Sequence, residues 1–153
     1  NHTPFVFSGI TKFFFNPQSK HPDGNWYSLR PLGTEGQGTD NEPSRTIYDL
    51  HGTSIPFGIG YKFNIYNFIT LNFNISWRIT FTDYLDDVSK TYVSSSTLND
   101  VGSELANQSD ADFLNGFQRG NPYNNDKYGF FGISIMYSIK DPKKGCSNMQ
   151  INE

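Results

Sequence analysis

The segment ITLNFNISWRITF, residues 69–81, alternates between apolar and polar side chains without interruption. Its odd-numbered positions hold Ile, Leu, Phe or Trp, and its even-numbered positions hold Thr, Asn, Ser or Arg. Successive side chains of a β-strand point to opposite faces, so the pattern predicts a strand with one apolar and one polar face. This strand would have 13 residues, whereas an average strand in a soluble protein has about five or six.

Three further segments predict strands, at residues 5–15, 55–65 and 128–140. The second and third of these alternate as residues 69–81 do, with apolar side chains at odd-numbered positions. The first is dense in Phe but has apolar side chains at both parities, which predicts a bulge near Gly9. The expected fold is therefore all-β, with four long antiparallel strands.

The composition supports β-structure and narrows the functional classes. Aromatic residues reach 16% of the chain, and their side chains suit a pleated surface. The net charge of −3 and the scattered Lys and Arg residues give no nucleic-acid footprint. A single cysteine excludes an intramolecular disulfide. No apolar run approaches the roughly 18 residues of a membrane helix, although that test does not detect transmembrane strands.

The connections between the predicted strands alternate in length. Residues 16–54 and 82–127 form long connections, whereas only residues 66–68 join the second and third strands. Long outer loops and short periplasmic turns are typical of outer-membrane β-barrels. Because opposed residues must share a face, the short turn predicts that Ile65 pairs with Ile69.

Strand length separates two architectures. A soluble β-sandwich would also alternate, but about 9–11 tilted residues cross a bilayer, and the Gly, Ser, Thr and Asn of the polar faces suit a narrow lumen. Since about eight strands close a small barrel, we expect residues 1–140 to be the C-terminal four strands of an eight-stranded transmembrane β-barrel with long extracellular loops. The other strands would precede residue 1 or come from other chains, and residues 141–153 would be a periplasmic tail. The last long loop is expected to contain one short helix within residues 97–109, with Thr97 as its N-cap.

Four segments carry a resemblance to a known family: TPFVFSGITKFFFNP (3–17), PLGTEGQGT (31–39), TFTDYLDDVSKTYV (80–93) and RGNPYNNDKYGFFGISIMYSI (119–139). In their order and spacing they resemble the PorG-like family of small outer-membrane barrels of Bacteroidota, which includes a component of the type IX secretion system. The family's first four strands have no counterpart in this chain. The resemblance implies an eight-stranded barrel in the bacterial outer membrane, without catalytic activity or cofactor.

The resemblance also implies partners. Members of this family contact outer-membrane lipids and the periplasmic ring of the secretion motor, so the expected role is a structural anchor of an envelope protein-secretion machine. A small-ligand or transport barrel, or an interaction subunit of another outer-membrane complex, is the alternative. An enzyme is disfavoured, because the sequence contains neither a GxSxG segment nor a histidine spacing typical of a zinc site.

The candidate site residues lie at the strand ends, on the polar face and in the tail. Asp83, Asp86 and Asp87 are weak candidates for a calcium site, since Ca²⁺ takes six to eight oxygen ligands. Arg78, on the polar face of residues 69–81, would need a carboxylate or carbonyl partner in a lumen. Glu35 or an acid on other strands of the barrel would supply that partner.

The tail offers a different kind of surface. Lys143, Lys144 and Cys146 follow the last predicted strand and form a possible docking segment for a periplasmic partner. The two lysines would favour the thiolate of the cysteine, but no histidine accompanies it, so a catalytic or redox role is not expected.

Overall fold

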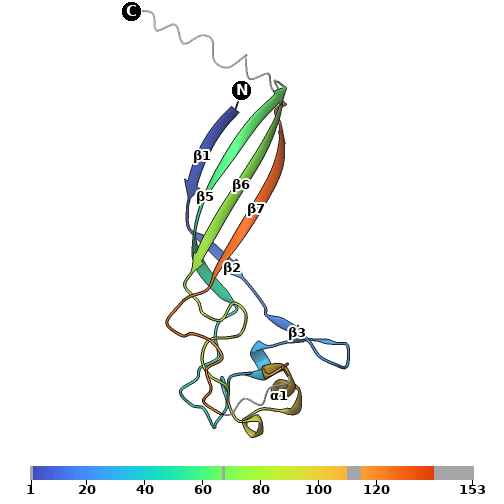
Figure 1. Ribbon diagram of the computed structural model, residues 1–153, viewed down its shortest axis with the longest axis vertical. Coiled ribbons are helices and arrows are strands. Elements are labelled where there is room, and N and C mark those ends of the chain that lie inside the picture. The colour runs from blue at the N-terminus through green and yellow to red at the C-terminus, as the bar shows by residue number, and fades with distance from the viewer. Residues whose placement is uncertain (1, 67, 110–114, 140–153) are drawn as a thin grey trace, which may run out of the picture. The chain divides into compact units, whose positions relative to one another are not determined.

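The computed structural model describes residues 2–66, 68–109 and 115–139. In these residues the chain is mostly antiparallel β-sheet with little helix, which confirms the all-β prediction (Figure 1). The elements in chain order are β1 (His2–Ser8), β2 (Thr11–Phe14), β3 (Gln18–Lys20), β4 (Trp26–Ser28), the 3-10 helix η1 (Arg30–Leu32), β5 (His51–Tyr66), β6 (Ile69–Thr80), the 3-10 helix η2 (Ser95–Thr97), α1 (Asp100–Ala106) and β7 (Lys127–Tyr137). None of the described helices is long and apolar enough to cross a membrane.

The long strands follow the alternating segments closely. β6 ends one residue before the predicted boundary, and β7 covers most of residues 128–140, of which residue 140 lies outside the described part. β5 begins four residues earlier than predicted, at His51. The main sheet has the order β1-β5-β6-β7, with β2 also paired to β5.

The predicted bulge near Gly9 is wrong. Ser8 lies opposite Phe57 in the β1–β5 pair, and Thr11 lies opposite Ser54 in the β2–β5 pair, so both pairs of residue numbers add up to 65. The register on β5 is therefore the same on both sides of Gly9, and no residue is inserted. The apolar side chains at even-numbered and odd-numbered positions instead lie on the two opposite faces of the sheet. The exposed face carries Val6, Ile10 and Phe14.

The turn between β5 and β6 has the predicted register. Thr70 Oγ1 donates a hydrogen bond to Asn64 Oδ1, and the Phe81 N–H donates to the Thr53 carbonyl. In both pairs the residue numbers add up to 134, as they do for 65 and 69. The odd-numbered apolar residues of the two strands consequently share one face.

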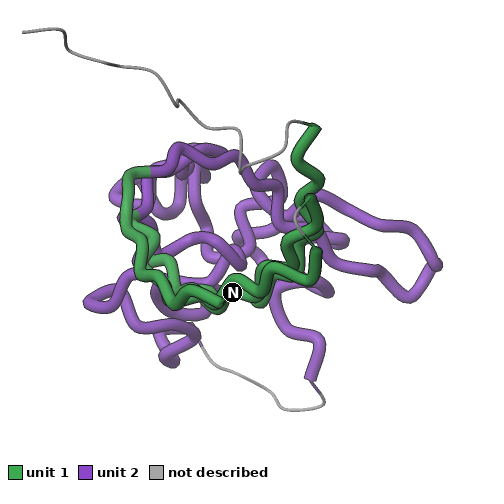
Figure 2. Tube along the Cα trace, turned by 90° about the horizontal axis from the view of Figure 1, so that it is seen from above, with its two compact units in different colours: residues 1–10, 55–78, 127–153 green, residues 11–54, 79–126 purple. Residues whose placement is uncertain are grey.

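The chain divides into two compact units, which we describe separately (Figure 2). Unit 1 comprises Asn1–Ile10, Ile55–Arg78 and Lys127–Glu153, and unit 2 comprises Thr11–Ser54 and Ile79–Asp126. The strands of unit 1 trace an open arc in Figure 2. Within the described residues the edge strands β1 and β7 each have a partner on one side only. Unpaired strand edges are sites at which further strands can add.

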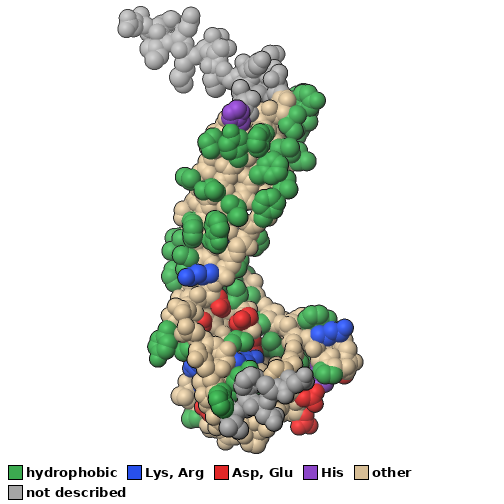
Figure 3. All heavy atoms as spheres, viewed as in Figure 1, with side chains coloured by type: hydrophobic (Ala, Val, Ile, Leu, Met, Phe, Trp, Pro, Cys, Tyr) green, Lys and Arg blue, Asp and Glu red, His purple; other side chains and the backbone are tan. Residues whose placement is uncertain are grey.

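The two faces of the unit 1 sheet differ in chemistry. The apolar face consists of the odd-numbered residues of β5, β6 and β7 and the even-numbered residues of β1, and Figure 3 shows hydrophobic side chains gathered over these strands. The polar face consists of the opposite parities. There the ring of Phe7 covers Gly58, where an added Cβ would lie 2.6 Å from Phe7 Cζ and 2.6 Å from the Ile75 carbonyl oxygen. Only glycine fits beneath this ring.

Unit 2 contains the short elements that alternation did not predict. β3 and β4 form a hairpin with Lys20 opposite Trp26. The predicted short helix is present as α1, but its N-cap is Asn99 and not Thr97. Asn99 Oδ1 accepts a hydrogen bond of 2.7 Å from the Gly102 N–H, which satisfies a backbone donor of the first turn.

Candidate functional site

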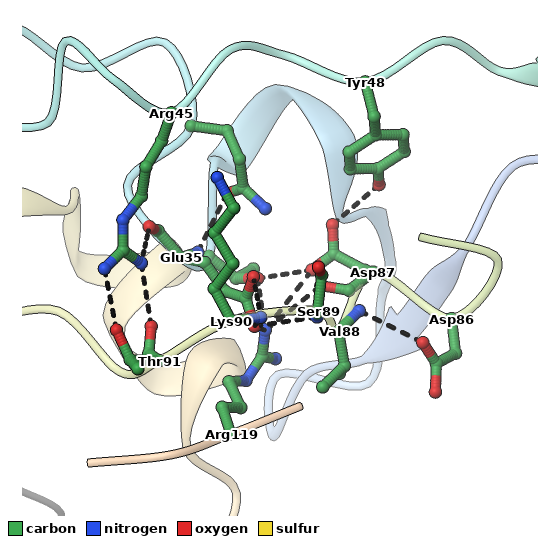
Figure 4. A network of polar contacts seen from close by, with 12 residues as sticks. Glu35, Arg45, Tyr48, Asp86, Asp87, Val88, Ser89, Lys90, Thr91 and Arg119 are labelled. Carbon is green, nitrogen blue, oxygen red and sulfur yellow. Dashed lines mark hydrogen bonds and ion pairs between the residues drawn. The ribbon is translucent and has the colours of Figure 1, made fainter. Parts of the chain in front are cut away.

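A buried carboxylate lies at the centre of the loops of unit 2 (Figure 4). Glu35 is 0% exposed. Its Oε1 accepts hydrogen bonds from the Ser89 N–H at 3.0 Å and the Lys90 N–H at 3.1 Å, and Oε2 accepts from Lys90 at 3.0 Å. Arg119 Nη1 lies 3.4 Å from Glu35 Oε1. The carboxylate thus joins the loop after η1 to the segments around residues 89 and 119.

A second buried carboxylate lies beside the first. Asp87 is also 0% exposed and has a φ of 70°, a left-handed conformation that Asp tolerates better than most residues. Tyr48 Oη donates to Asp87 Oδ1 at 2.6 Å, and Thr34 Oγ1 donates to Asp87 Oδ2. Arg119 Nη1 donates to the Asp87 carbonyl at 3.1 Å and to Thr34 Oγ1 at 2.9 Å.

Burial sets the electrostatics of this network. It raises the pKa of Glu35, although the Ser89 and Lys90 N–H groups and Arg119 oppose the shift. Burial likewise raises the pKa of Asp87 against the hydrogen bonds of Thr34 and Tyr48. One guanidinium, that of Arg119, forms ion pairs with both carboxylates, at 3.4 and 3.9 Å. Because both acids are fully buried, the network suits cross-linking of the loops and not contact with a substrate.

Further groups extend the cross-links. Arg45 Nη1 donates to the carbonyls of Glu35 at 2.7 Å and Thr91 at 2.9 Å, and its Nη2 donates to Thr91 Oγ1. The ring of Tyr48 stacks on Tyr84 with centroids 4.7 Å apart. Unit 2 is therefore held by hydrogen bonds, ion pairs and ring stacking around a mostly polar centre.

The three candidate metal ligands have separate roles. Asp87 belongs to the buried network, whereas Asp86 Oδ1 accepts a hydrogen bond from the Val88 N–H at 3.1 Å and so stabilises its own turn. Burial raises the pKa of Asp83, and the nearby Asp86 adds to that effect. Among residues 2–66, 68–109 and 115–139, no group of three or more His, Cys, Asp or Glu side chains is placed to hold a metal ion.

Arg78 lies on the polar face of unit 1, against aromatic rings. Its guanidinium carbon is 4.0 Å from the ring centroid of Phe130 and 5.6 Å from that of Tyr128. Its Nη1 is buried and has no hydrogen-bond partner among the described residues. Glu35, one of the two partners considered for Arg78, instead binds Arg119 and backbone N–H groups. Lys143, Lys144 and Cys146 lie outside the described residues.

A polar pocket of about 470 Å³ lies between the β3–β4 hairpin and α1. His21 Nε2 lies 2.8 Å from Glu104 Oε2, and Gln108 Nε2 donates to Ser19 Oγ at 2.7 Å. These contacts attach the hairpin to the helix. His21, Glu104 and Gln108, which line the pocket, therefore also hold the two elements together.

The buried network joins three of the segments that carry the family resemblance. Thr34 and Glu35 come from residues 31–39, Asp87 comes from residues 80–93, and Arg119 begins the segment 119–139. Sequence reasoning missed Arg119 and Tyr48 as members of the site, and the only signal for Arg119 was its place at the start of one of those segments. No protein-family model, curated protein or solved structure matches this chain.

Proposed function

We propose that the long strands of unit 1 span the bacterial outer membrane as the C-terminal four strands of an eight-stranded β-barrel. The observation that carries this proposal is the inverted exposure of the sheet. Ile135 is 72% exposed and Ile59 is 57% exposed on the apolar face, whereas Ser76 on the opposite face is 2% exposed. Water does not favour such a distribution, but hydrocarbon around a barrel does.

Strand length supports the same proposal. β5 has 16 residues, β6 has 12 and β7 has 11. A tilted strand of about 9–11 residues crosses the hydrocarbon core. All three strands meet that requirement, and each keeps its alternation over the length needed.

Aromatic side chains mark one end of the strands. The rings of Tyr66 and Phe68 stack with centroids 6.1 Å apart, and Phe68 meets Tyr137 edge-on at 5.6 Å. Aromatic residues gather where a membrane protein meets the interface between lipid and water. We assign this end to the periplasmic side, because it carries the short turn, and the long connections to the cell exterior.

The role we propose is a non-enzymatic anchor for an envelope protein-secretion machine of the type IX kind. It rests on the family resemblance and on a polar face that is already occupied by its own side chains, such as Phe7 over Gly58. A transport or small-ligand barrel is the alternative. Steady single-channel conductance of the purified protein in a planar bilayer would favour that alternative over the anchor.

Membrane topology is the first test. In a Cys146→Ser background, Asp100→Cys in α1 and Asn67→Cys between β5 and β6 would be treated in intact cells with a membrane-impermeant maleimide. We expect labelling of Asp100→Cys alone, and of both cysteines after the cells are lysed. Labelling of Asn67→Cys but not Asp100→Cys in intact cells would overturn the proposed orientation, and absence of both variants from the membrane fraction would overturn the barrel.

The anchoring role has its own test. A variant that ends at Asp141 lacks Lys143, Lys144 and Cys146. We expect it to insert as the parent does but to lose periplasmic partners when it is purified from mildly solubilised membranes. Unchanged recovery of those partners would argue against docking through the tail.

A further inference from the structure

The described part of unit 1 carries positive charge without a carboxylate. Residues 2–10, 55–78 and 127–139 contain Lys62, Arg78 and Lys127 but no Asp or Glu. By parity, Lys62 and Arg78 lie on the polar face, whereas Lys127 lies on the apolar face at the start of β7. The polar face therefore has two cations and no anion of its own.

Arg78 stacks on an aromatic ring, and one of its guanidinium nitrogens lacks an acceptor among the described residues. The ring of Phe130 lies 4.0 Å from its guanidinium carbon, a separation at which cation and ring attract each other. Its buried Nη1 has no hydrogen-bond partner in the described residues. A planar guanidinium stacked on a ring keeps its N–H groups at the edge of the plane, where they can bind a carboxylate through two hydrogen bonds.

Lys62 also lies over an aromatic ring, at another level of the same face. Its Nζ lies 5.0 Å from the ring centroid of Phe5, and the Phe5 ring in turn covers Gly60. The register places Lys62 beside Asn72 on β6, because their numbers also add up to 134. Arg78 follows Asn72 by six positions on β6, so the two cations lie about 20 Å apart along the sheet.

The acids of unit 2 that lie in its buried network are already bound. Both Glu35 and Asp87 form ion pairs with Arg119 and accept further hydrogen bonds. A barrel closed around the polar face would remove water from Arg78 and Lys62. A cation that loses its water without gaining an anion destabilises the closed state, so a closed barrel needs negative charge facing Arg78 and Lys62.

We propose that the β-strands completing this sheet present carboxylates to its polar face, one to Arg78 and one at the level of Lys62. This inference rests on the proposed barrel. It states which charge the completing strands place opposite the polar face of the described strands. The completing strands add at the unpaired edges of β1 and β7, and their inward-facing Asp or Glu side chains neutralise the two cations. Charge complementarity would then favour one rotational setting of the two half-barrels over others.

The test compares charge variants of the complete barrel in detergent micelles, with chloride as the only anion. Arg78→Gln is expected to lower the folding equilibrium constant at pH 7 by roughly 10–100-fold, the typical range for a hydrogen-bonded charged group. Lys62→Gln should show a smaller loss in the same direction, Arg78→Lys should recover part of it, and Lys127→Gln serves as the control. Folding would be followed by urea titration and by the mobility of unboiled samples in SDS gels.

The pH profile gives a readout that packing alone would not change. Protonation of a carboxylate paired with Arg78 would remove the ion pair, so the parent should lose stability as the pH falls through about 4. Arg78→Gln should lose much less over that range. An unchanged profile, with or without loss of stability, would overturn the proposal, because Arg78 would then act without a carboxylate.

Two further outcomes are informative. If added phosphate stabilises the parent but not Arg78→Gln, Arg78 binds an anion from solution. The proposal that the completing strands supply carboxylates would then be wrong. If Arg78→Gln fails to insert, the same pH comparison is made with Lys62→Gln, and an unchanged profile there overturns the proposal. Failure of the parent itself to enter membranes would count against the barrel and would be seen independently in the fractionation and labelling experiment.

Discussion

The two units of this chain place their polar and apolar groups in opposite ways. In unit 1 the large apolar side chains are exposed, as at Ile135, and small polar ones such as Ser76 are buried. In unit 2 two carboxylates are fully buried, and the buried hydrophobic residues of the described chain are also found there. These four residues are Leu29, Tyr48, Val93 and Leu105.

Under the proposed membrane insertion, the difference would correspond to two solvents for one polypeptide. A sheet with an exposed apolar face is stable where the surroundings are themselves apolar, because lipid removes the cost of hydrating that face. Loops in water cannot use that contribution, and their few buried hydrophobic residues leave the folding of unit 2 dependent on paired charges. Each unit contains one tryptophan, Trp77 in unit 1 and Trp26 in unit 2. The unfolding of each unit can therefore be followed by the fluorescence of its own tryptophan.

The largest effect is expected from removal of the shared cation of unit 2. Arg119→Met leaves Glu35 and Asp87 buried without their guanidinium, and loss of one partner from a buried ion pair costs about 3–5 kcal/mol. The free energy of unfolding of unit 2 would be followed by Trp26 fluorescence in a Trp77→Phe background. Glu104→Gln, which changes a carboxylate that is 58% exposed and lies beside His21, is the control and should change stability by less than about 0.5 kcal/mol. Equal effects of the two variants would contradict a polar core.

A charge on the apolar face should break unit 1 selectively. Ile75→Arg is expected to destabilise the inserted protein by about 2–4 kcal/mol, the cost of a basic residue at the bilayer midplane. Asn74→Arg, one position along the strand, points to the polar face and should cost less. Trp77 fluorescence during urea titration in lipid vesicles measures both variants. Similar costs would mean that residues of the two parities do not face different surroundings.

A single methyl group tests the packing of the polar face. Gly58→Ala would place Cβ 2.6 Å from both Phe7 Cζ and the Ile75 carbonyl oxygen, and backbone cannot move aside as a side chain can. Overpacking of this kind costs about 1–3 kcal/mol. In Gly129→Ala the nearest atom would be 3.6 Å away, and urea titration should detect little change. If both variants are tolerated, the ring of Phe7 does not lie over Gly58.

The smallest expected effect concerns the helix in unit 2. Asn99→Ala removes the side chain that accepts from the Gly102 N–H, which should cost about 1 kcal/mol. Thr97→Ala, at the N-cap expected from the sequence, should be close to neutral. Trp26 fluorescence in the Trp77→Phe background compares them, and a larger loss for Thr97→Ala would reverse the assignment of the cap.

Sequence alone predicted the strands in which apolar and polar residues alternate. Alternation located β5, β6 and β7, and parity arithmetic gave the register of the short turn. It failed at Gly9, because a strand with aromatic residues on both faces looks like a strand with a shifted register. The three-residue strands β3 and β4 are too short to show a period. The buried network joins residues as far apart as 53 positions for Thr34 with Asp87 and 85 positions for Thr34 with Arg119, and no local pattern encodes such pairs.

The short turn between β5 and β6 has a consequence for the order of folding. Contacts across this hairpin close a small loop, whereas pairing Ser8 with Phe57, or Thr80 with Asp126, closes a loop of more than 40 residues. Loop closure costs more entropy as the loop grows, and nonlocal pairing slows folding. We therefore expect the β5–β6 hairpin to form first and to serve as the template on which β1 and β7 add. Destabilising substitutions in this hairpin should slow folding, whereas those in β1 or β7 should mainly speed unfolding.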